Sequence, residues 1–507
     1  MSDSAVIYSV DPRTGIQSVS AARPSSADEV AAAVAAATGA AQPLTAIGRE
    51  GRATLLDAVA QELRADAEQL VLICRRETGL AETRLNAELE RTAAQLEFLG
   101  DVVREGSYLN LTIDHETTGA TARPELRLMN VALGPVAVFA ASNFPFAFSV
   151  AGGDTASALA VGCPVVVKAH SSHPDTSLRT AAAVGRAVRS VGLPPGTVGL
   201  VFGRTAGIDL VRHPDIRAVG FTGSVAGGRA LAEHAARRPD PIPFYGELGS
   251  VNPFVVTPAA ANARGAEIAR DVVASFTLGA GQFCTKPGLV FVPAGSGGDA
   301  LVEAARRETE ESIAGYSLNA GIFQDFGRVT DDLQSDPAAR LTVGRAAGDD
   351  GFAVRSLLLE IDAESFGSEH AEEHFGPLAV IVRYSDIAQL EGILRGLAGA
   401  LVGTVHGEAQ DEVARRVLPL LAERSGRVVW NGVPTGVAVT WASNHGGPWP
   451  SAYDARHSSV GAASIGRWVR PIAWQNAPQD VLPPELRDDD DSAPRRVDGV
   501  LRLPIAG

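Results

Sequence analysis

The sequence predicts an α/β protein with two parallel-sheet domains and a small β arm. Short Val-rich runs alternate with Ala-rich helical stretches from Gly134 onward, a second such series starts near Phe254, and two β-like segments precede both series. Strands that are apolar along their whole length and separated by helices are typical of parallel sheets covered on both faces. Two such series predict two sheets with a cleft between their domains.

The first hundred residues are predicted to form an Ala-rich helical layer, over 25–105. Ser26 and Glu29 fit a capping box, and apolar residues recur at three-to-four spacing between Leu55 and Ile73. After this layer come two β-like segments, LNLTI (109–113) and ELRLMNVAL (125–133), joined by a turn-rich stretch. These two segments predict an antiparallel hairpin, which forms the arm.

The first parallel series predicts a Rossmann-like, nucleotide-binding domain. Its expected strands are 136–141, 164–169, 197–202 and 218–223, with helices through Ala160 and over 175–191. The expected strands of the second series are 252–256, 288–292, 378–384, 401–406 and 427–430. In the tail, four consecutive aspartates, 488–491, repel one another and predict an exposed loop.

Composition excludes several classes of protein. The 507 residues carry 44 basic and 59 acidic side chains, a net charge of −15, which argues against a nucleic-acid partner because such binding depends largely on Lys and Arg. The 45% apolar and 20% charged residues exclude global disorder. The longest nearly uncharged apolar stretch, 155–167, is shorter than the roughly 20 residues of a spanning helix, so no membrane partner is expected.

The cysteines point to a reducing compartment. Cys74, Cys163 and Cys284 are odd in number and show no C-x-x-C spacing, so neither a disulfide framework nor a metal site is expected. The first fifteen residues lack the basic and apolar regions of a signal peptide. We therefore expect a cytoplasmic protein.

A cysteine and a glutamate are the first candidates for chemistry. Cys284 lies in a Gly-rich loop, GAGQFCTKPG (279–288), as a reactive thiolate requires, whereas Cys74 and Cys163 lie in apolar segments typical of inert thiols. Glu247 lies 37 residues before Cys284, in GELGSVNP (246–253), which is predicted to be a turn. A carboxylate that faces a thiol can act as general base for water attacking an acyl-thioester. Taken singly, an inert cysteine and a solvated glutamate are the alternatives.

Two polar residues follow expected strands of the first series. Asn143, in AASNFPFAF (140–148), can donate a hydrogen bond to an oxyanion formed by thiolate attack on a carbonyl. Lys168 ends the next strand and can meet a cofactor ribose or phosphate, because ligands of doubly wound sheets bind at the carboxyl ends of strands. A turn-capping asparagine and a solvated lysine are the alternatives.

Together and in this order, these motifs resemble the aldehyde dehydrogenase family, from about residue 5 to 475. The resemblance rests on SNFP (142–145), Lys168, FTGSVAGG (221–228), ELGSVNP (247–253), GQFCT (281–285) and EEHFGP (372–377). It implies that Cys284, Glu247 and Asn143 are catalytic. It also implies a set of cofactor contacts, made by Lys168, Gly223, Ser224, Gly228, Glu373 and Phe375.

Departures from the family's commonest pattern imply NADP⁺ as cofactor, with NAD⁺ left possible. Ser171 stands where NAD⁺-specific members carry an acidic residue, and an acid there would repel a ribose 2′-phosphate. Arg204 is either a partner of this phosphate or an ordinary surface arginine. The resemblance extends to a subgroup of NADP⁺-dependent α-ketoglutaric semialdehyde dehydrogenases and bacterial fatty-aldehyde dehydrogenases. The subgroup's HGGP stretch (445–448) contains His445, either a proton-transfer residue near the thiol or a structural imidazole.

The resemblance implies oxidation of an aldehyde to a carboxylate through a thiohemiacetal and a thioester on Cys284, with α-ketoglutaric semialdehyde as the expected substrate and 2-oxoglutarate as the product. Such a substrate requires a distal cation, for which Arg84 and Arg91 are candidates. A fatty aldehyde requires an apolar tunnel instead, for which the candidates are Phe144, Phe146 and Phe148. The alternatives are a broad-specificity or fatty-aldehyde enzyme, a CoA-acylating enzyme, which generally lacks the glutamate at position 247, and a non-catalytic relative.

The resemblance also divides the chain. It implies an NADP-binding domain (1–111 and 134–245), a catalytic domain (246–465), and an oligomerisation arm and tail (112–133 and 466–507). The arm and tail resemble elements whose strands pair between subunits, so a homodimer or homotetramer is expected.

Overall fold

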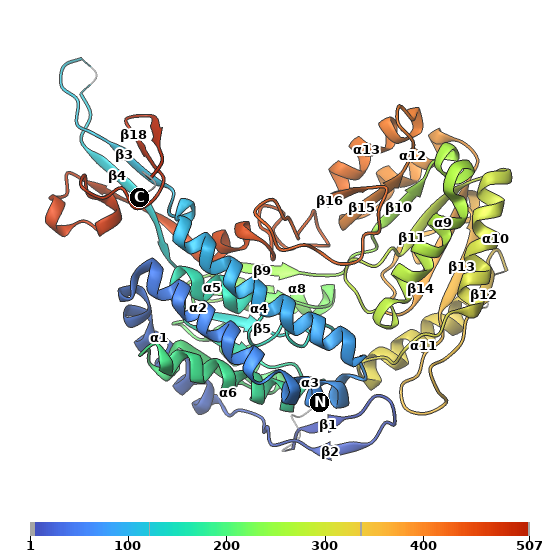
Figure 1. The fold of residues 1–507 in the computed structure, drawn as a ribbon, viewed down its shortest axis with the longest axis horizontal. Helices are drawn as coiled ribbons and strands as arrows, with labels where there is room; N and C mark the ends of the chain where they lie inside the picture. The colour runs from blue at the N-terminus through green and yellow to red at the C-terminus, as the bar shows by residue number, and fades with distance from the viewer. Residues whose placement is uncertain (1–5, 121, 335–336, 505–507) are drawn as a thin grey trace.

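The computed structural model describes residues 6–120, 122–334 and 337–504. These residues form a five-stranded parallel sheet, a seven-stranded sheet, a five-stranded arm sheet and a two-stranded hairpin. The arm sheet lies at the upper left of Figure 1, the seven-stranded sheet at the upper right, and the parallel sheet between and below them. The predicted fold class, α/β with a Rossmann-like sheet, a second α/β sheet and a small β arm, is confirmed. The expectations for residues 1–5 and 505–507 lie outside the described residues.

The parallel sheet has the strand order β7-β6-β5-β8-β9. Its strands are β5 (Val136–Phe139), β6 (Val165–Lys168), β7 (Val198–Val201), β8 (Ala218–Thr222) and β9 (Phe244–Glu247). Four of them coincide with predicted strands. The turn predicted at 246–253 is right for 248–252, which connect two strands, but wrong for Glu247, which ends β9 and pairs with Thr222 of β8. Gly246 lies within β9, a short strand stabilised by pairing with β8, and local composition does not reveal this pairing.

Both faces of the parallel sheet are buried, because successive residues of a strand point to opposite sides. Val136 and Val138 of β5 belong to one hydrophobic core, whereas Ala137 and Phe139 belong to the core on the other face. The first core includes side chains of α2 (Gly48–Ala65), α3 (Ala67–Thr78), α4 (Glu82–Glu105), α5 (Gly153–Val161) and α6 (Pro174–Ser190). The second core includes side chains of α1 (Ala27–Ala46), α7 (Arg204–Arg212) and α8 (Val225–Ala236). The capping box predicted for the first helix is present at Ser26 and Glu29.

The order of strands creates a switch point beside β5. The chain runs outward from β5 through β6 to β7, and then begins again on the other side of β5 with β8 and β9. Ligands of doubly wound sheets bind at the carboxyl ends of strands around such a point. Lys168 ends β6, Thr222 ends β8, and Asn143 follows β5 in the next loop, so the predicted polar residues reach this edge.

The seven-stranded sheet has the order β12-β13-β14-β11-β10-β15-β16. Its strands are β10 (Pro253–Val256), β11 (Leu289–Pro293), β12 (Arg340–Val343), β13 (Leu357–Asp362), β14 (Leu378–Tyr384), β15 (Ala400–His406) and β16 (Ser425–Trp430). Five of them match predicted strands, whereas β12 and β13 extend the sheet at one edge beyond the prediction. The pair β12–β13 is antiparallel and the other pairs are parallel.

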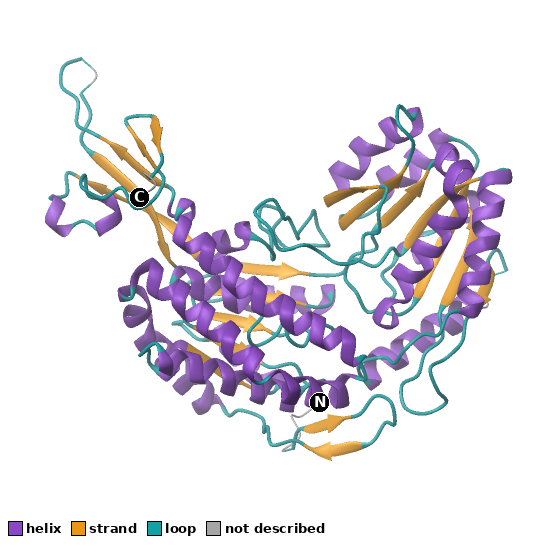
Figure 2. Cartoon of the chain, in the orientation of Figure 1, coloured by secondary structure: helices purple, strands orange, loops and turns teal. Residues whose placement is uncertain are grey.

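Helices cover both faces of the seven-stranded sheet as well (Figure 2). Phe254 and Val256 of β10 pack in one core, with α9 (Pro258–Thr277) and α10 (Ser296–Glu311). Val255 packs on the opposite face, in the core that includes α11 (Ala320–Gln334), α12 (Ile387–Gly396) and α13 (Glu412–Arg424). The near-continuous apolar runs of these strands follow from this two-sided burial.

The arm sheet joins distant parts of the chain, in the order β17-β4-β3-β18-β19. Its strands are β3 (Leu111–Asp114), β4 (Leu126–Ala132), β17 (Val469–Gln475), β18 (Arg495–Val497) and β19 (Val500–Arg502). The predicted hairpin is present, since β3 and β4 pair antiparallel with Thr112 opposite Leu128. The tail supplies strands on both sides of the hairpin, because β17 pairs with β4 and β18 pairs with β3.

The aspartate run lies in a loop, as predicted, but two of its carboxylates are paired. Asp488 Oδ1 lies 2.7 Å from Nη2 of Arg127, whose side chain is 1% exposed, and Asp490 Oδ1 lies 3.0 Å from Nη2 of Arg495. Nη1 of Arg127 also donates to the Leu486 carbonyl at 2.6 Å. These contacts hold the tail against the arm sheet.

The remaining elements are short. The N-terminal hairpin pairs β1 (Tyr8–Val10) with β2 (Gln17–Val19). Short 3₁₀ helices connect other elements, at Ser107–Leu109, Pro195–Thr197, Leu278–Gly281, Ala363–Ser365, Ser368–Ala371, Ala462–Trp468, Gln479–Val481 and Pro484–Leu486. In the described ranges no helix is by itself long and apolar enough to cross a membrane; α1 and α2, bent by 117°, meet that length and composition only as a pair.

Candidate active site

Cys284 lies in the loop between the 3₁₀ helix at Leu278–Gly281 and β11. Gly279, Ala280 and Gly281 have φ values of 57°, 56° and 66°, a left-handed run that turns the chain sharply ahead of the cysteine. At Gly281 a Cβ atom would lie 2.2 Å from the Gly376 carbonyl oxygen, so the backbone approach requires glycine. This turn packs the 372–377 segment against the loop over 282–288 that carries Cys284, the nucleophile expected from the sequence.

Asn252 anchors the nucleophile loop to the seven-stranded sheet. Its Nδ2 donates to the carbonyl oxygens of Cys284 and Lys286, at 2.7 and 2.9 Å, and its Oδ1 accepts from the Val402 N–H at 3.1 Å. Asn252 is fully buried and has a φ of 56°. It stands in the ELGSVNP motif, yet no local pattern signals these contacts, and it is absent from the predicted site residues.

Replacing Asn252 by alanine is expected to lower the free energy of unfolding by about 2–4 kcal/mol, because buried carbonyls and an amide lose their partners. The thermal midpoint should fall, and Cys284, no longer fixed through its carbonyl, should lose activity. Calorimetry and steady-state kinetics measure the two effects. Asn86→Ala, at an exposed position of α4, is the control. Equal stability of the two variants would contradict the anchoring role.

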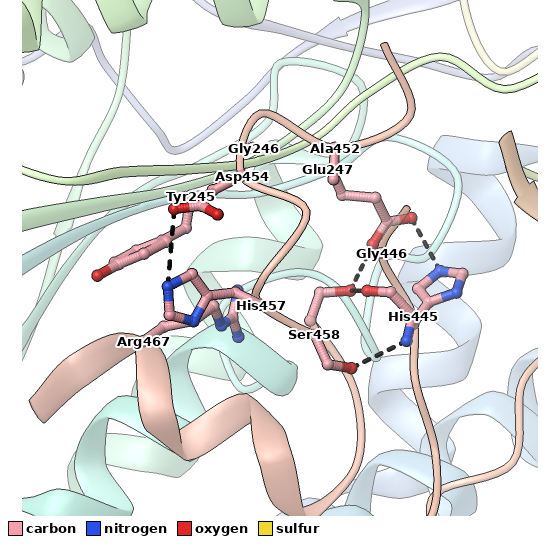
Figure 3. Close-up of a pocket in the computed structure, with 11 residues that line it drawn as sticks. Tyr245, Gly246, Glu247, His445, Gly446, Ala452, Asp454, His457, Ser458 and Arg467 are labelled. Carbon is pink, nitrogen blue, oxygen red and sulfur yellow. Dashed lines mark hydrogen bonds and ion pairs between the residues drawn. The ribbon is translucent and has the colours of Figure 1, made fainter. Parts of the chain in front are cut away.

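Glu247, His445 and Cys284 converge on one point (Figure 3 shows Glu247 and His445 facing each other). Nε2 of His445 lies 2.9 Å from Glu247 Oε1 and 3.6 Å from Cys284 Sγ. Ser459 Oγ donates to Glu247 Oε2 at 2.7 Å, and the His445 N–H donates to Ser458 Oγ at 2.9 Å. Neither serine could be identified from the sequence, because its hydrogen bond forms only when the 445–459 segment folds against the end of β9.

The thiol and the carboxylate have pKa values shifted in opposite directions. Desolvation raises the pKa of the Cys284 thiol well above its usual range, although part of the residue stays exposed, and the Glu247 carboxylate raises that pKa further. Burial alone would raise the pKa of Glu247, but His445 and Ser459 outweigh it, so this pKa lies below its usual value. These two shifts favour a neutral thiol beside an ionised carboxylate.

Asn143 lies next to the nucleophile loop. Its Nδ2 donates to the Gln282 carbonyl at 2.9 Å, and its own carbonyl accepts from Arg84 Nη2 at 2.7 Å. The Arg84 guanidinium carbon lies 5.3 Å from the ring centre of Phe144 and 4.6 Å from that of Phe283, in a cation–π contact with each. Arg84 is thus engaged with the Asn143 segment and does not offer the free distal cation that the sequence predicts for it.

The three candidate phenylalanines separate into two environments. Phe146 is 1% exposed and packs in the core of the parallel sheet. The Phe144 and Phe148 rings lie 5.4 Å apart, and the Phe148 ring lies 6.2 Å from the His445 ring. Only the latter two lie near the thiol, so Phe146 does not line the tunnel considered for it.

Three predicted cofactor residues line one cavity. Lys168, Ser171 and Arg204 surround a space of about 310 Å³ at the carboxyl end of β6, together with Tyr8 and Phe202. Two cations and a hydroxyl suit an anionic ribose phosphate, and the position matches the ligand edge of a doubly wound sheet.

The glycine-rich segment starts α8 and packs against the end of β9. Ser224 caps the helix by accepting from the Gly227 N–H, and the Gly223 N–H donates to the Glu247 carbonyl at 3.0 Å. At Gly228 a Cβ atom would lie 2.3 Å from Cδ2 of Leu248. The helix N-terminus is suited to a phosphate of a dinucleotide.

Glu373 and Phe375 lie in the segment that leads to β14. Glu373 keeps much of its surface exposed, but its carboxyl group points inward, since a Cβ atom on Gly249 would lie 2.5 Å from Oε2. Desolvation raises the pKa of this carboxyl group to about 7. Glu373 is thereby close to the Glu247 segment, while Phe375 is half-buried two residues further on.

Comparisons with known proteins agree with this geometry. A family model described as the aldehyde dehydrogenase family matches residues 1–466. The chain is 45% identical over 468 residues to α-ketoglutaric semialdehyde dehydrogenase 2 of Azospirillum brasilense, covering 90% of this chain and 88% of the relative. It is 40% identical over 460 residues to α-ketoglutaric semialdehyde dehydrogenase of Acinetobacter baylyi, covering 89% and 88%.

A solved structure of lactaldehyde dehydrogenase shares the fold, with a TM-score of 0.82 and 22% identity over 94% of this chain and 96% of that one. The chain belongs to the aldehyde dehydrogenase family.

Proposed function

We propose that the protein oxidises α-ketoglutaric semialdehyde to 2-oxoglutarate with NADP⁺, through a thiohemiacetal and a thioester on Cys284. The observation that carries the proposal is the position of His445 Nε2, 3.6 Å from the thiol and 2.9 Å from Glu247. It is supported by the names of two relatives at 45% and 40% identity.

Family membership makes the chain an aldehyde dehydrogenase, which oxidises an aldehyde to the acid with a nicotinamide cofactor. The particular aldehyde, the preference for NADP⁺ and the residue roles are our inference. One aldehyde, one water and one NADP⁺ give a carboxylate, NADPH and two protons.

The first chemical step is formation of a bond between Cys284 Sγ and the aldehyde carbon. The pair of Glu247 and His445 takes the thiol proton, and the thiolate then attacks the carbonyl. The resulting oxyanion accepts hydrogen bonds from Asn143 Nδ2 and from the Cys284 N–H, once Asn143 exchanges its bond to Gln282 for one to the substrate.

The second half of the reaction releases the acid. Lys168, Ser171 and Arg204 would hold NADP⁺, which would supply the hydride acceptor for oxidation of the thiohemiacetal on Cys284 to a thioester. After the pair of Glu247 and His445 releases the first proton to solvent, Glu247 takes a proton from water, which attacks the thioester and expels Cys284 as a thiolate. A small cavity lined by Glu247, His445 and Ser459 has room for about one water molecule on the side of the carboxylate.

Arg204→Ala is expected to lower kcat/KM for NADP⁺ by about 10- to 100-fold relative to kcat/KM for NAD⁺, because it removes a charge-assisted contact to the 2′-phosphate. Kinetics with both cofactors measure the ratio. Arg212→Ala, at the other end of α7, is the matched control and should leave the ratio unchanged. A strong preference of the wild type for NAD⁺ would overturn the cofactor assignment to Lys168, Ser171 and Arg204.

The substrate is tested by NADPH production across a panel of aldehydes. The panel contains α-ketoglutaric semialdehyde, succinic semialdehyde, a medium-chain alkanal and an aromatic aldehyde, and the first should give the highest kcat/KM. A higher value for the alkanal would overturn the proposed substrate in favour of a fatty aldehyde. Turnover that requires CoA would overturn the hydrolytic mechanism.

We also infer a homodimer or homotetramer joined through the arm sheet. The edge strand β19 exposes Val500 and Leu501, at 63% and 58%, and such edges are usually covered. Light scattering on the purified protein measures the mass. A cytoplasmic location is inferred from the three unpaired cysteines, which suit a reducing compartment.

A further inference from the structure

Two positively charged arginines, from different parts of the fold, lie around the segment that contains Cys284. Arg91 lies on α4, and Arg427 lies on β16, the edge strand of the seven-stranded sheet. Desolvation lowers the pKa of both guanidinium groups, and in each case the charge of the Cys284 sulfur opposes this shift. Hydrogen bonds also place both side chains on the loop that contacts Thr285, the residue after Cys284.

Both arginines bind one loop, residues 431–443, beside the nucleophile. Nη2 of Arg91 donates to the Val437 carbonyl at 3.4 Å, and Nη2 of Arg427 donates to the Pro434 carbonyl. Between these two carbonyls, the Gly436 N–H donates to Thr285 Oγ1 at 2.9 Å. Because Thr285 follows Cys284 in the chain, the loop ties the two arginines to the immediate surroundings of the thiol.

Each arginine keeps a buried donor that has no partner. Nη1 of Arg91 and Nε of Arg427 are buried without a hydrogen bond, and in the described part of the chain no carboxylate forms an ion pair with either group. Glu88 supplies the main opposing charge for Arg91, but its Oε1 accepts from the Phe146 and Ala147 N–H groups. A partly buried cation with an unpartnered buried donor costs free energy, which an anionic ligand would offset.

We propose that Arg91 and Arg427 form a subsite for the substrate carboxylate, at the end of the substrate opposite to the aldehyde. The subsite rests on the proposed function and deepens it, since it limits the preferred substrates to aldehydes that carry a terminal carboxylate. The Arg91 guanidinium carbon lies 5.9 Å from the ring centre of Phe148, which in turn lies 6.2 Å from the His445 ring. Phe148 thus offers an apolar surface for the methylene groups between the two ends.

Arg84, the other cation on α4, has a different position. Its guanidinium donates to the Asn143 carbonyl at 2.7 Å and lies against Phe144 and Phe283. Arg84 therefore acts on Asn143, a step common to all aldehydes, whereas Arg91 and Arg427 face the part of the substrate that differs among aldehydes.

The test compares α-ketoglutaric semialdehyde with pentanal, which has the same number of carbons and no charge. In Arg91→Met and Arg427→Met, the ratio of kcat/KM for the semialdehyde to that for pentanal should fall about 10- to 100-fold. Arg84→Met should slow both aldehydes alike and keep the ratio. Arg456→Met, at a side chain 82% exposed, is the surface control.

A second measurement does not depend on turnover. Glutarate, a dicarboxylate, should slow the alkylation of Cys284 by iodoacetamide in the wild type, and this protection should be lost in both variants. Arg427→Lys retains the positive charge and should therefore keep part of the protection by glutarate. Such partial protection would show that the site still folds when Arg427 is replaced.

Unchanged ratios and unchanged protection in both methionine variants would overturn the subsite while leaving the proposed function intact. The proposed function would instead be overturned if the wild type failed to oxidise either aldehyde, with NADP⁺ or with NAD⁺.

Discussion

Replacing Cys284 by serine is expected to lower turnover of the aldehyde by at least about 10³-fold. A serine hydroxyl is far less acidic than a thiol, so the pair of Glu247 and His445 does not ionise it, and an ester is a poorer acyl carrier than a thioester. The rate of NADPH formation under saturating aldehyde measures the effect. Every later step passes through the bond to Sγ, so this change should have the largest effect of any single substitution.

Two controls separate loss of the nucleophile from loss of the fold. Binding of NADPH, followed by its fluorescence, should persist in Cys284→Ser, because the cavity proposed for the cofactor lies at β6 and α7. Cys74→Ser, which changes a fully buried thiol of α3, is the matched variant and should retain activity. Undiminished dehydrogenase activity in Cys284→Ser would refute the covalent mechanism.

Replacing Glu247 by glutamine is expected to slow hydrolysis of the thioester by about 10²- to 10⁴-fold, because the amide cannot take a proton from water. Hydride transfer precedes this step and should be less affected. A stopped-flow trace should therefore show a burst of NADPH that approaches one equivalent per site, followed by a slow steady state. Equal loss of the burst and of the steady state would count against Glu247 as the hydrolytic base.

The same substitution should move the titration of the thiol. In the wild type, desolvation and the Glu247 carboxylate both raise the pKa of Cys284, so alkylation by iodoacetamide should accelerate with pH only above the usual range of a thiol. Glutamine removes the negative charge, and the thiol pKa should fall, so the alkylation curve should shift to lower pH. A shift to higher pH would contradict the electrostatic assignment.

The parts of the fold that local pattern determines were predictable. The runs around β5, β6 and β14 are apolar on both faces, which identifies parallel strands without any knowledge of their neighbours. β9 and β12 differ from these strands, because they mix polar and apolar residues. They form strands because they pair with β8 and β13, respectively.

The residues of the candidate active site also fall into two groups, those marked by a local motif and those that depend on contacts with distant segments. Cys284 and Glu247 stand in motifs that mark them in any context, and the fold brings both to His445, as the resemblance implies for a residue near the thiol. Asn252 and Ser459 act through contacts with segments far away in the chain, so no spacing or composition reveals them. Arg84 was predicted as a candidate near the substrate, but the sequence does not reveal its hydrogen bond to the Asn143 carbonyl.

The arm sheet has a consequence for the order in which the chain folds. Its central hairpin, β3 and β4, is synthesised early, whereas β17, β18 and β19 come from residues 469–502, which follow both parallel-sheet domains in the chain. Until those residues leave the ribosome, β3 and β4 present unpaired edges and Arg127 lacks Asp488 and the Leu486 carbonyl. Closing the sheet thus requires contacts of very high sequence separation, which form slowly. Completion of the arm is therefore a late event in folding, which follows the synthesis of both parallel-sheet domains.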